Sequence, residues 1–241
     1  MQTIYANGRH GGAETALLVA GWLRPLFTAE VKREPTRILL VRHGQTVTNR
    51  EGRFCGHSET ALTELGRRQA GALGERLRPV RIDAAYASDF SRAMDTAAMV
   101  LAGREVQLRV DANLRELHYG EWEQEKEREI ARRYPEQHRL MRDEDPAWQP
   151  PGGETIGMVR ARTAAAFRRI VRAHSHETVL VVSHGTAINC LVAELLSIPP
   201  SHTFRFTVEN CGLTEIAMHR SIAVVTRLND TSHLAGLESR S

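Results

Sequence analysis

The sequence predicts a three-layer α/β/α protein with a mostly parallel central sheet. Two apolar runs, Ile38–Val41 and Val179–Val182, have the length of strands that are covered on both faces, as strands of parallel sheets are. Helical patterns alternate with strands along the chain, which is typical of a sheet with helices on both sides. The chain has 241 residues, of which 41% are hydrophobic and 25% charged, so it is long enough to bury a full core.

The first half of the chain after residue 36 alternates between strand and helix. Thr63 is the expected N-cap of a helix that ends before Pro79, and its core-facing residues at helical spacing are Leu65, Ala70, Leu73 and Leu77. A short strand over 84–88 ends at Ser88. A helix over 90–103 is expected to stop at Gly103, because glycine readily terminates helices. Residues 105–110 alternate between apolar and polar and predict another strand.

The second half begins with a polar, charged segment over 111–151, which is expected to be an inserted cover rather than core. It contains one predicted helix, around 123–134. A long helix over 154–174 follows, then the strand that ends at His184 and a helix over 186–196. The remaining patterns predict strands over 203–208, 213–218 and 223–228.

The predicted organisation is one domain preceded by an N-terminal appendage. Residues 1–35 form this appendage, because the first convincing strand starts only at Arg37, and the apolar run Ala16–Leu23 predicts that it is helical. Residues 36–235 form the domain, with the cover inserted around 117–151. The run Ala16–Leu23 is too short to span a bilayer, so no association with a membrane is expected.

Charge and cysteine usage argue against several functional classes. The net charge is only +3, and neither a basic stripe nor a base-reading element is visible, so no binding to nucleic acid is expected. Cys55, Cys190 and Cys211 are odd in number and lack metal-ligand spacing. They are expected to be reduced thiols in a cytoplasmic protein that has no metal site. A homodimer is an open option.

Residues whose side chains could take part in catalysis cluster at the ends of the predicted strands. In a parallel sheet these ends meet at one edge, where ligands bind. The two most apolar strands each end in a histidine followed by glycine, and further strand ends lead to an arginine and a glutamate. The five residues expected at this edge are Arg42, His43, Arg92, Glu116 and His184. Each one alone is an ordinary solvated or core residue, but their joint placement is difficult to explain without a function.

This set of side chains fits phosphoryl transfer without a metal or another cofactor. Two guanidinium groups in one pocket repel each other unless an anion lies between them, and their planar geometry matches phosphate oxygens. A neutral imidazole is a good nucleophile toward phosphorus. A nearby carboxyl group can protonate the leaving alkoxide. The first strand therefore ends in Arg42-His43 because it carries a nucleophile and part of its anion clamp.

Several ordered motifs resemble those of the histidine phosphatase superfamily, in its phosphoglycerate mutase-like branch (branch 1). They are "LVRHGQTVTN", "GRFCGHSETALTELGRRQA", "SDFSRAMDTA", "LRELHYGEWE", "PPGGET" and "VVSHGTAI". The resemblance covers about residues 37–233 and implies the phosphoglycerate mutase-like fold.

The same resemblance implies a role for individual residues. His43 would be phosphorylated during catalysis, and Glu116 would donate a proton and later act as the base for water. The groups that would bind the phosphoryl group are those of Arg42, Arg92, His184 and Asn49, together with the backbone at Gly185. Ser88 matches a serine that supports the site, although it could equally be a strand-end cap.

Three functions remain open. The favoured one is a metal-independent phosphomonoesterase that acts on a small phosphorylated metabolite. The second is a phosphoglycerate mutase dependent on 2,3-bisphosphoglycerate, which is disfavoured because mutase-like residues are replaced by Leu117 and Thr186 and because Lys126 is out of register. The third, a catalytically weak adaptor, is lowest because all five core residues are present. The cover and three rim residues are expected to determine which substrate binds; the rim residues are Arg53, His57 and Tyr119.

Overall fold

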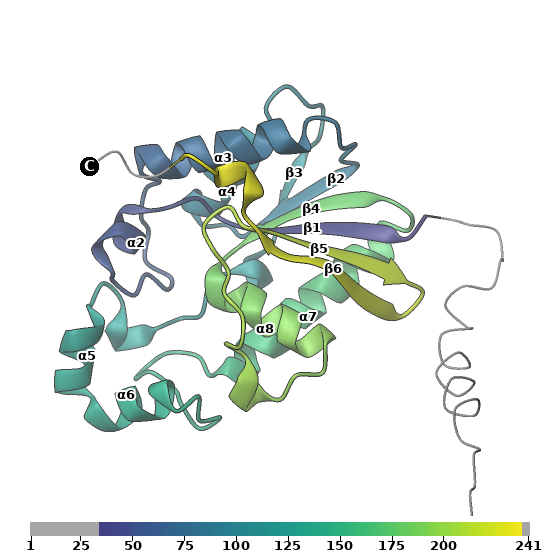
Figure 1. Ribbon diagram of the computed structural model, residues 1–241. Coiled ribbons are helices and arrows are strands. Elements are labelled where there is room, and N and C mark those ends of the chain that lie inside the picture. Colours follow the sequence, from purple (N-terminus) through teal and green to yellow (C-terminus); the bar gives the residue numbers. More distant parts are fainter. Residues whose placement is uncertain (1–33, 238–241) are drawn as a thin grey trace, which may run out of the picture. The chain divides into compact units, whose positions relative to one another are not determined.

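The computed structural model describes residues 34–237, which contain a six-stranded sheet with the order β3-β2-β4-β1-β5-β6 (Figure 1). β1, β2, β3 and β4 are parallel to their neighbours within this group, whereas β5 is antiparallel to both of its neighbours, β1 and β6. The strands are β1 Thr36–Arg42, β2 Ala84–Ala87, β3 Leu108–Val110, β4 Thr178–Ser183, β5 Leu213–His219 and β6 Ile222–Asp230. The expected α/β class with a mostly parallel sheet is confirmed, and the carboxyl ends of four strands share one edge.

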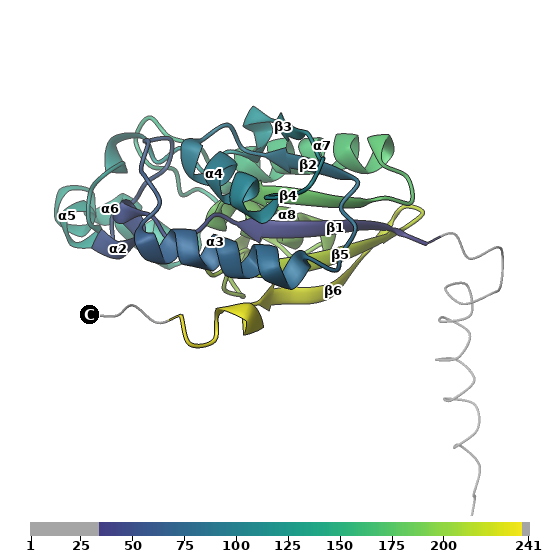
Figure 2. The same cartoon turned by 90° about the horizontal axis from the view of Figure 1, so that it is seen from above.

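Helices cover both faces of the sheet (Figure 2). Alternate residues of β1 point to opposite sides: Leu39 and Val41 pack in the cluster that contains α3 and α4 residues, and Ile38 and Leu40 in the cluster that contains α7 and α8 residues. The helices of the described part of the chain are α2 Val47–Glu51, α3 Glu64–Leu77, α4 Ser91–Val100, α5 Glu127–Arg133, α6 Pro135–Arg142, α7 Ile156–Ala173 and α8 Gly185–Leu195. The side chain of Thr63 caps α3, as expected, by accepting a hydrogen bond from the Gly66 N–H.

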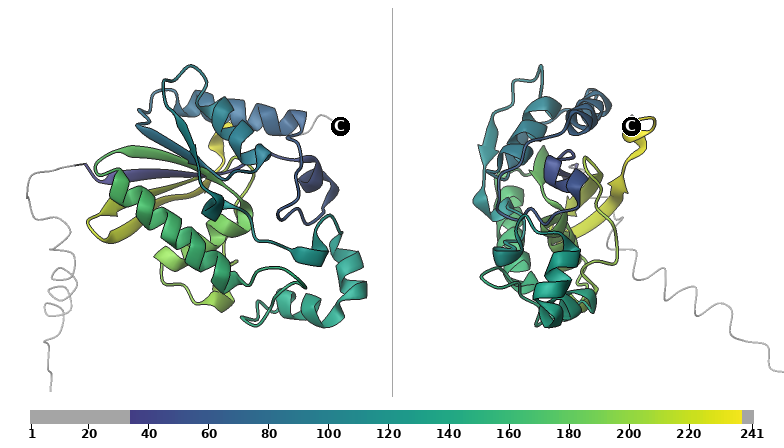
Figure 3. Two further views of the ribbon diagram at one scale, coloured as in Figure 1. Left: turned by 180° about the vertical axis from the view of Figure 1, so that it is seen from behind. Right: turned by 90° about the vertical axis from the view of Figure 1, so that its left-hand side faces the viewer.

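The segment between β3 and α7 carries α5 and α6 and lies beyond the strand ends (Figure 3). A third apolar cluster holds it in place, in which Trp122, Ile130 and Trp148 pack against residues at the start of α7 and α8. Trp122 and Ile130 are completely buried. The apolar side chains of this polar segment therefore attach it to the domain beside the edge where the candidate residues lie.

The helices of this segment differ from the prediction in two ways. The helix expected around 123–134 starts only at Glu127, because Gln124 adopts a left-handed conformation with φ of 65°. The helix α6 was not predicted. It begins with Pro135 at its first position, where a missing N–H costs little, and this proline also ends α5.

Two other boundaries differ from the prediction, and one predicted strand is absent. The helix expected to stop at Gly103 ends at Val100, and Gly103 lies in the following turn with φ of 76°. The strand predicted over 105–110 is reduced to Leu108–Val110. Residues 203–208 form no strand, and the Val208 carbonyl accepts from the side chain of Arg42 instead of from a neighbouring strand. The alternating apolar residues Phe206 and Val208 instead pack on the core as part of a loop.

The appendage predicted over 1–35 lies almost entirely outside the described residues, which begin at Glu34. Within 34–237, no helix combines the length and the apolar character needed to cross a membrane.

Candidate active site

His43 follows directly after β1 and is almost completely buried, with 4% of its surface exposed. Its Nδ1 lies 2.8 Å from the carbonyl oxygen of Gly44. Because a carbonyl oxygen can only accept, Nδ1 must carry the ring proton and donate it. Nε2 is then left with an unshared electron pair. Burial lowers the pKa of His43 well below its usual value, and the charges of Arg42 and Arg92 lower it further. The ring is therefore neutral at pH 7.

Arg92 projects from the first turn of α4 and is 1% exposed. Its Nη1 and Nη2 donate to the carbonyl oxygens of Ser58 and Gly56, at 2.9 and 2.7 Å. Its Nε donates to Nδ1 of His184 at 3.3 Å. These three contacts fix the guanidinium in one orientation. One N–H on each terminal nitrogen is not used by them and can serve an anion.

His184 follows directly after β4 and is fully buried beside His43, with 5.1 Å between the two ring centroids. Its Nδ1 accepts from Arg92, so its own proton lies on Nε2. This Nε2 is buried and has no protein partner. Burial lowers the pKa of His184 well below its usual value, and so do the neighbouring charge of Arg92 and the ring of His43. His184 is thus a neutral N–H donor.

Arg42, the last residue of β1, contributes the second guanidinium. Its Nη1 donates to the Val208 carbonyl oxygen at 2.6 Å, and its Nε is buried without a partner. Burial lowers the pKa of Arg42, and the charge of Glu116 opposes this effect. An arginine keeps its proton in proteins despite such a shift, so the side chain remains a cation.

The carboxyl group of Glu116 is held by two backbone N–H groups. Oε1 accepts from Leu117 at 2.8 Å, and Oε2 accepts from Thr186 at 3.2 Å, in the first turn of α8. The hydroxyl groups of Tyr119 and Thr186 are 3.0 Å apart, and burial together with the charge of Glu116 raises the pKa of Tyr119. The tyrosine therefore stays neutral, and the two hydroxyl groups form one wall beside the glutamate.

Asn49 and Asn210 tie the α2 region to the loop after β1. Oδ1 of Asn49 accepts from the Thr46 N–H and from Nδ2 of Asn210, both at 3.2 Å. Asn210 also donates to the His43 carbonyl oxygen at 2.9 Å. Because the oxygen of Asn49 is occupied in this way, its amide nitrogen is the end that can bind a ligand.

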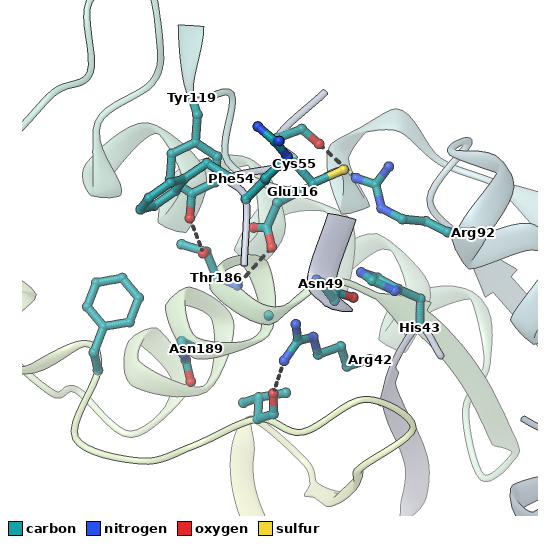
Figure 4. Close-up of a pocket in the computed structure, with 15 residues that line it drawn as sticks. Arg42, His43, Asn49, Phe54, Cys55, Arg92, Glu116, Tyr119, Thr186 and Asn189 are labelled. Carbon is teal, nitrogen blue, oxygen red and sulfur yellow. Dashed lines mark hydrogen bonds between the residues drawn. The ribbon is translucent and has the colours of Figure 1, made fainter. Parts of the chain in front are cut away.

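These side chains converge on a cavity of about 330 Å³ (Figure 4). The sequence-predicted residues that line it are Arg42, His43, Asn49, Arg53, Arg92, Glu116, Tyr119 and Gly185. His184 is not among the lining residues, although its ring contacts the ring of His43 edge-on. Ser88 does not line the cavity either. It is fully buried, and its hydroxyl accepts from the Phe90 N–H at 3.3 Å, which is the contact of a strand-end cap.

Other lining residues were not predicted as site residues: Phe54, Cys55, Gly56, Thr186, Asn189, Phe204 and Val208. Asn189 lies three residues after Thr186, so the helical spacing of α8 could have indicated it. Its Oδ1 is buried without a partner. His57, expected at the rim, does not line the cavity, and its Nε2 contacts the Glu116 carbonyl oxygen at 2.9 Å. No group of three His, Cys, Asp or Glu side chains within residues 34–237 is arranged to hold a metal ion.

Known proteins share both the sequence and the fold. The model of the histidine phosphatase superfamily (branch 1) matches residues 38–231. The adenosylcobalamin/alpha-ribazole phosphatase of Salmonella typhimurium is 32% identical over 196 residues, which are 80% of this chain and 96% of that protein. The "Probable phosphoglycerate mutase GpmB" of Erwinia tasmaniensis is 31% identical over 203 residues, 82% of this chain and 94% of that protein.

Among solved structures, Bacillus stearothermophilus YhfR superimposes with a TM-score of 0.80 at 34% identity, covering 83% of this chain and 99% of that one. The family match extends over most of the described residues and includes all of the sheet except the first two residues of β1. The chain belongs to the histidine phosphatase superfamily, branch 1.

Proposed function

We propose that this chain is a metal-independent phosphomonoesterase that hydrolyses a small phosphorylated metabolite through a phosphohistidine at His43. The observation that carries the proposal is the state of the His43 ring. Its proton is committed to the Gly44 carbonyl, so the unprotonated Nε2 is the atom available for attack. The ring lies in a cavity that also contains two fixed guanidinium groups.

The phosphoryl group would bind between Arg42 and Arg92, whose planar ends match its oxygens. The amide nitrogen of Asn49 and the start of α8 at Gly185 add neutral donors, and both line the same cavity. Two positive charges offset the two negative charges of the substrate, which is the role that a metal ion has in other phosphatases.

In the first step, Nε2 of His43 attacks phosphorus. The N–P bond forms as the bond from phosphorus to the leaving oxygen breaks, and Glu116 gives its proton to that oxygen. In the second step, Glu116 takes a proton from water, and the oxygen of this water attacks the phosphoryl group. The N–P bond then breaks, so inorganic phosphate leaves and the ring is neutral again. The Nε2–H of His184, which has no protein partner, would donate to the phosphoryl oxygens in both transition states.

The charges around the cavity favour hydrolysis over the mutase alternative. A mutase must hold a second phosphate group and exclude water, which requires further cations. Apart from Arg42 and Arg92, the only lysine or arginine among the lining residues is Arg53, whose Nε is paired with Glu51 at 2.9 Å. Lys126 is not a lining residue. A relative named as a phosphatase and another named as a mutase match this chain about equally well, so their names alone do not decide.

The proposal extends to the location of the protein in the cell. The three cysteines are free thiols, as is usual in a reducing compartment, so we place the protein in the cytoplasm. A homodimer stays an open option, and the absence of nucleic-acid binding stays a prediction.

The test measures phosphate release from a panel of sugar phosphates, phosphoglycerates, phosphoamino acids and nucleotides. In parallel, 3-phosphoglycerate with catalytic 2,3-bisphosphoglycerate is followed for 2-phosphoglycerate. We expect at least one phosphomonoester to be hydrolysed faster than 2-phosphoglycerate is formed. If 2-phosphoglycerate is formed much faster than any ester is hydrolysed, the mutase function replaces the one proposed.

A further inference from the structure

We propose that Arg162 of α7, which forms an ion pair with Glu154, is the residue that positions Glu116 for proton transfer. This inference rests on the proposed function, in which Glu116 is the general acid. Arg162 does not line the cavity. It acts through the backbone, by fixing the loop that carries the acid.

Arg162 binds three carbonyl oxygens of that loop. Its Nη1 donates to Asn113 at 3.0 Å and to Arg115 at 2.6 Å, and its Nη2 donates to Glu116 itself at 2.8 Å. A single guanidinium therefore joins the turn after β3 to the acid. The planar fork of arginine suits this task, because its donors have fixed directions and lysine has none of comparable geometry.

Glu154 holds the guanidinium from the other side. Its Oε1 accepts from Nε of Arg162 and its Oε2 accepts from Nη2, both at 2.8 Å. The same Oε2 accepts from the His118 N–H at 3.0 Å, and the Glu154 N–H donates to the His118 carbonyl at 2.9 Å. The side chains of Arg162 and Glu154 are only 17% and 16% exposed, so water screens the pair less than it does a surface ion pair. The pair of Arg162 and Glu154 thus contacts residues before and after Glu116.

The loop needs such support because Glu116 lies on no strand or helix. Its carboxyl group reaches the first turn of α8 only through the Thr186 N–H at 3.2 Å. α7 is 18 residues long and packs on the sheet and on α8 through a buried face, so it provides a rigid base for the loop. A displacement of a catalytic group by about 1 Å can lower turnover by about 10²-fold. The position of the proton donor is therefore set by α7.

The test uses Arg162→Lys and a matched control, Arg160→Lys. Arg160 lies on the same helix and is also largely buried, but it donates to Glu194 at 3.0 Å and to the Ile198 carbonyl at 2.9 Å, away from the acid. Turnover is measured with an alkyl phosphate, whose leaving group needs a proton, and with p-nitrophenyl phosphate, whose leaving group scarcely does.

We expect Arg162→Lys to lower kcat/KM for the alkyl ester by roughly 10- to 100-fold and to change kcat/KM for the nitrophenyl ester much less. The comparison uses kcat/KM because it reports the phosphorylation step and not the second step, in which Glu116 is the base for both esters. Arg160→Lys should leave the ratio of the two rates as in the wild type. In a Glu116→Gln background, Arg162→Lys should cost little more, because the acid it positions is absent. Equal losses for the two esters, or independent losses in the double variant, would assign Arg162 a merely structural role and overturn the inference.

A second measurement does not depend on activity. The amide proton of Thr186, which donates to Glu116, is followed by NMR. Its resonance should shift in Arg162→Lys in the same direction as in Glu116→Gln, and should stay in place in Arg160→Lys. If the wild type hydrolyses no ester, the proposed function fails, while this resonance still reports whether Arg162 positions Glu116. An unshifted Thr186 amide in Arg162→Lys overturns the inference even if the enzyme is an active phosphatase.

Discussion

Acidification below pH 6.5 is expected to destabilise the fold through two histidines of the site, His43 and His184. Both are buried, and burial together with the neighbouring arginines lowers the pKa of each well below its usual value. In the unfolded chain, both rings titrate near pH 6.5. As the pH falls below that value, the unfolded state therefore binds protons that the folded state does not, so stability is lost.

The size of the effect follows from proton linkage. Between pH 7.5 and 5.5, protonation of one unfolded histidine stabilises the unfolded state by about 1 kcal/mol. In the limit where neither folded ring takes up a proton over this range, the two rings together lower the free energy of unfolding by about 2–3 kcal/mol. That is a large share of the roughly 5–15 kcal/mol that stabilises a typical domain.

The assay is urea unfolding at pH 7.5 and 5.5, followed by circular dichroism, for the wild type, His43→Gln and His184→Gln. Comparison of the two pH values for the same protein removes the packing cost of each substitution. Each variant lacks one ring that would bind a proton on unfolding, so it should lose about 1 kcal/mol less than the wild type over this range. The same pH dependence in all three proteins would show that neither ring is held neutral, and would refute the reasoning.

Three further predictions concern the site. Gly66→Ala makes a Cβ clash with the carbonyl oxygen of Gln45, in the loop after His43, so it should lower the free energy of unfolding in urea by about 1–3 kcal/mol; unchanged stability contradicts this close packing. Glu116→Gln should lower turnover of an alkyl phosphate by about 10²–10⁴-fold and that of p-nitrophenyl phosphate less, and equal losses with phosphorylation rate-limiting would mean that another residue supplies the proton. Activity should persist in excess chelator and be inhibited by vanadate; a loss that magnesium or zinc restores counts against the metal-independent mechanism.

The sheet and the cavity could be predicted because their signals are local. β1 and β4 are continuous apolar runs with a histidine directly after each, and parallel strands necessarily bring such ends to one edge. The positions of His43, Glu116 and Arg92 follow from this rule. Residues 203–208 show where the rule fails. Their apolar alternation is that of a strand, but Phe206 and Val208 pack on the core from a loop, and the Val208 carbonyl accepts from the side chain of Arg42 instead of from a neighbouring strand.

The support of the site could not be predicted, because it depends on contacts between distant segments. Arg162 lies 46 residues after Glu116 on an otherwise ordinary helical pattern, and only the fold shows that it contacts the acid's loop. His57 was expected to contact substrate, but its ring contacts the Glu116 carbonyl instead. Hydrogen bonds from side chains to backbone leave no periodic pattern in a sequence, so such positioning residues are recognised only in the structure.

The most direct test of the central claim is to identify the phosphorylated residue. The protein is mixed briefly with labelled substrate, quenched without acid and digested, and the label is mapped by mass spectrometry. We expect one acid-labile, base-stable phosphoryl group on His43, the residue whose Nε2 is unprotonated in the cavity, and no label in His43→Ala. Label that survives in His43→Ala, or that maps to a serine or cysteine, would contradict the phosphohistidine mechanism.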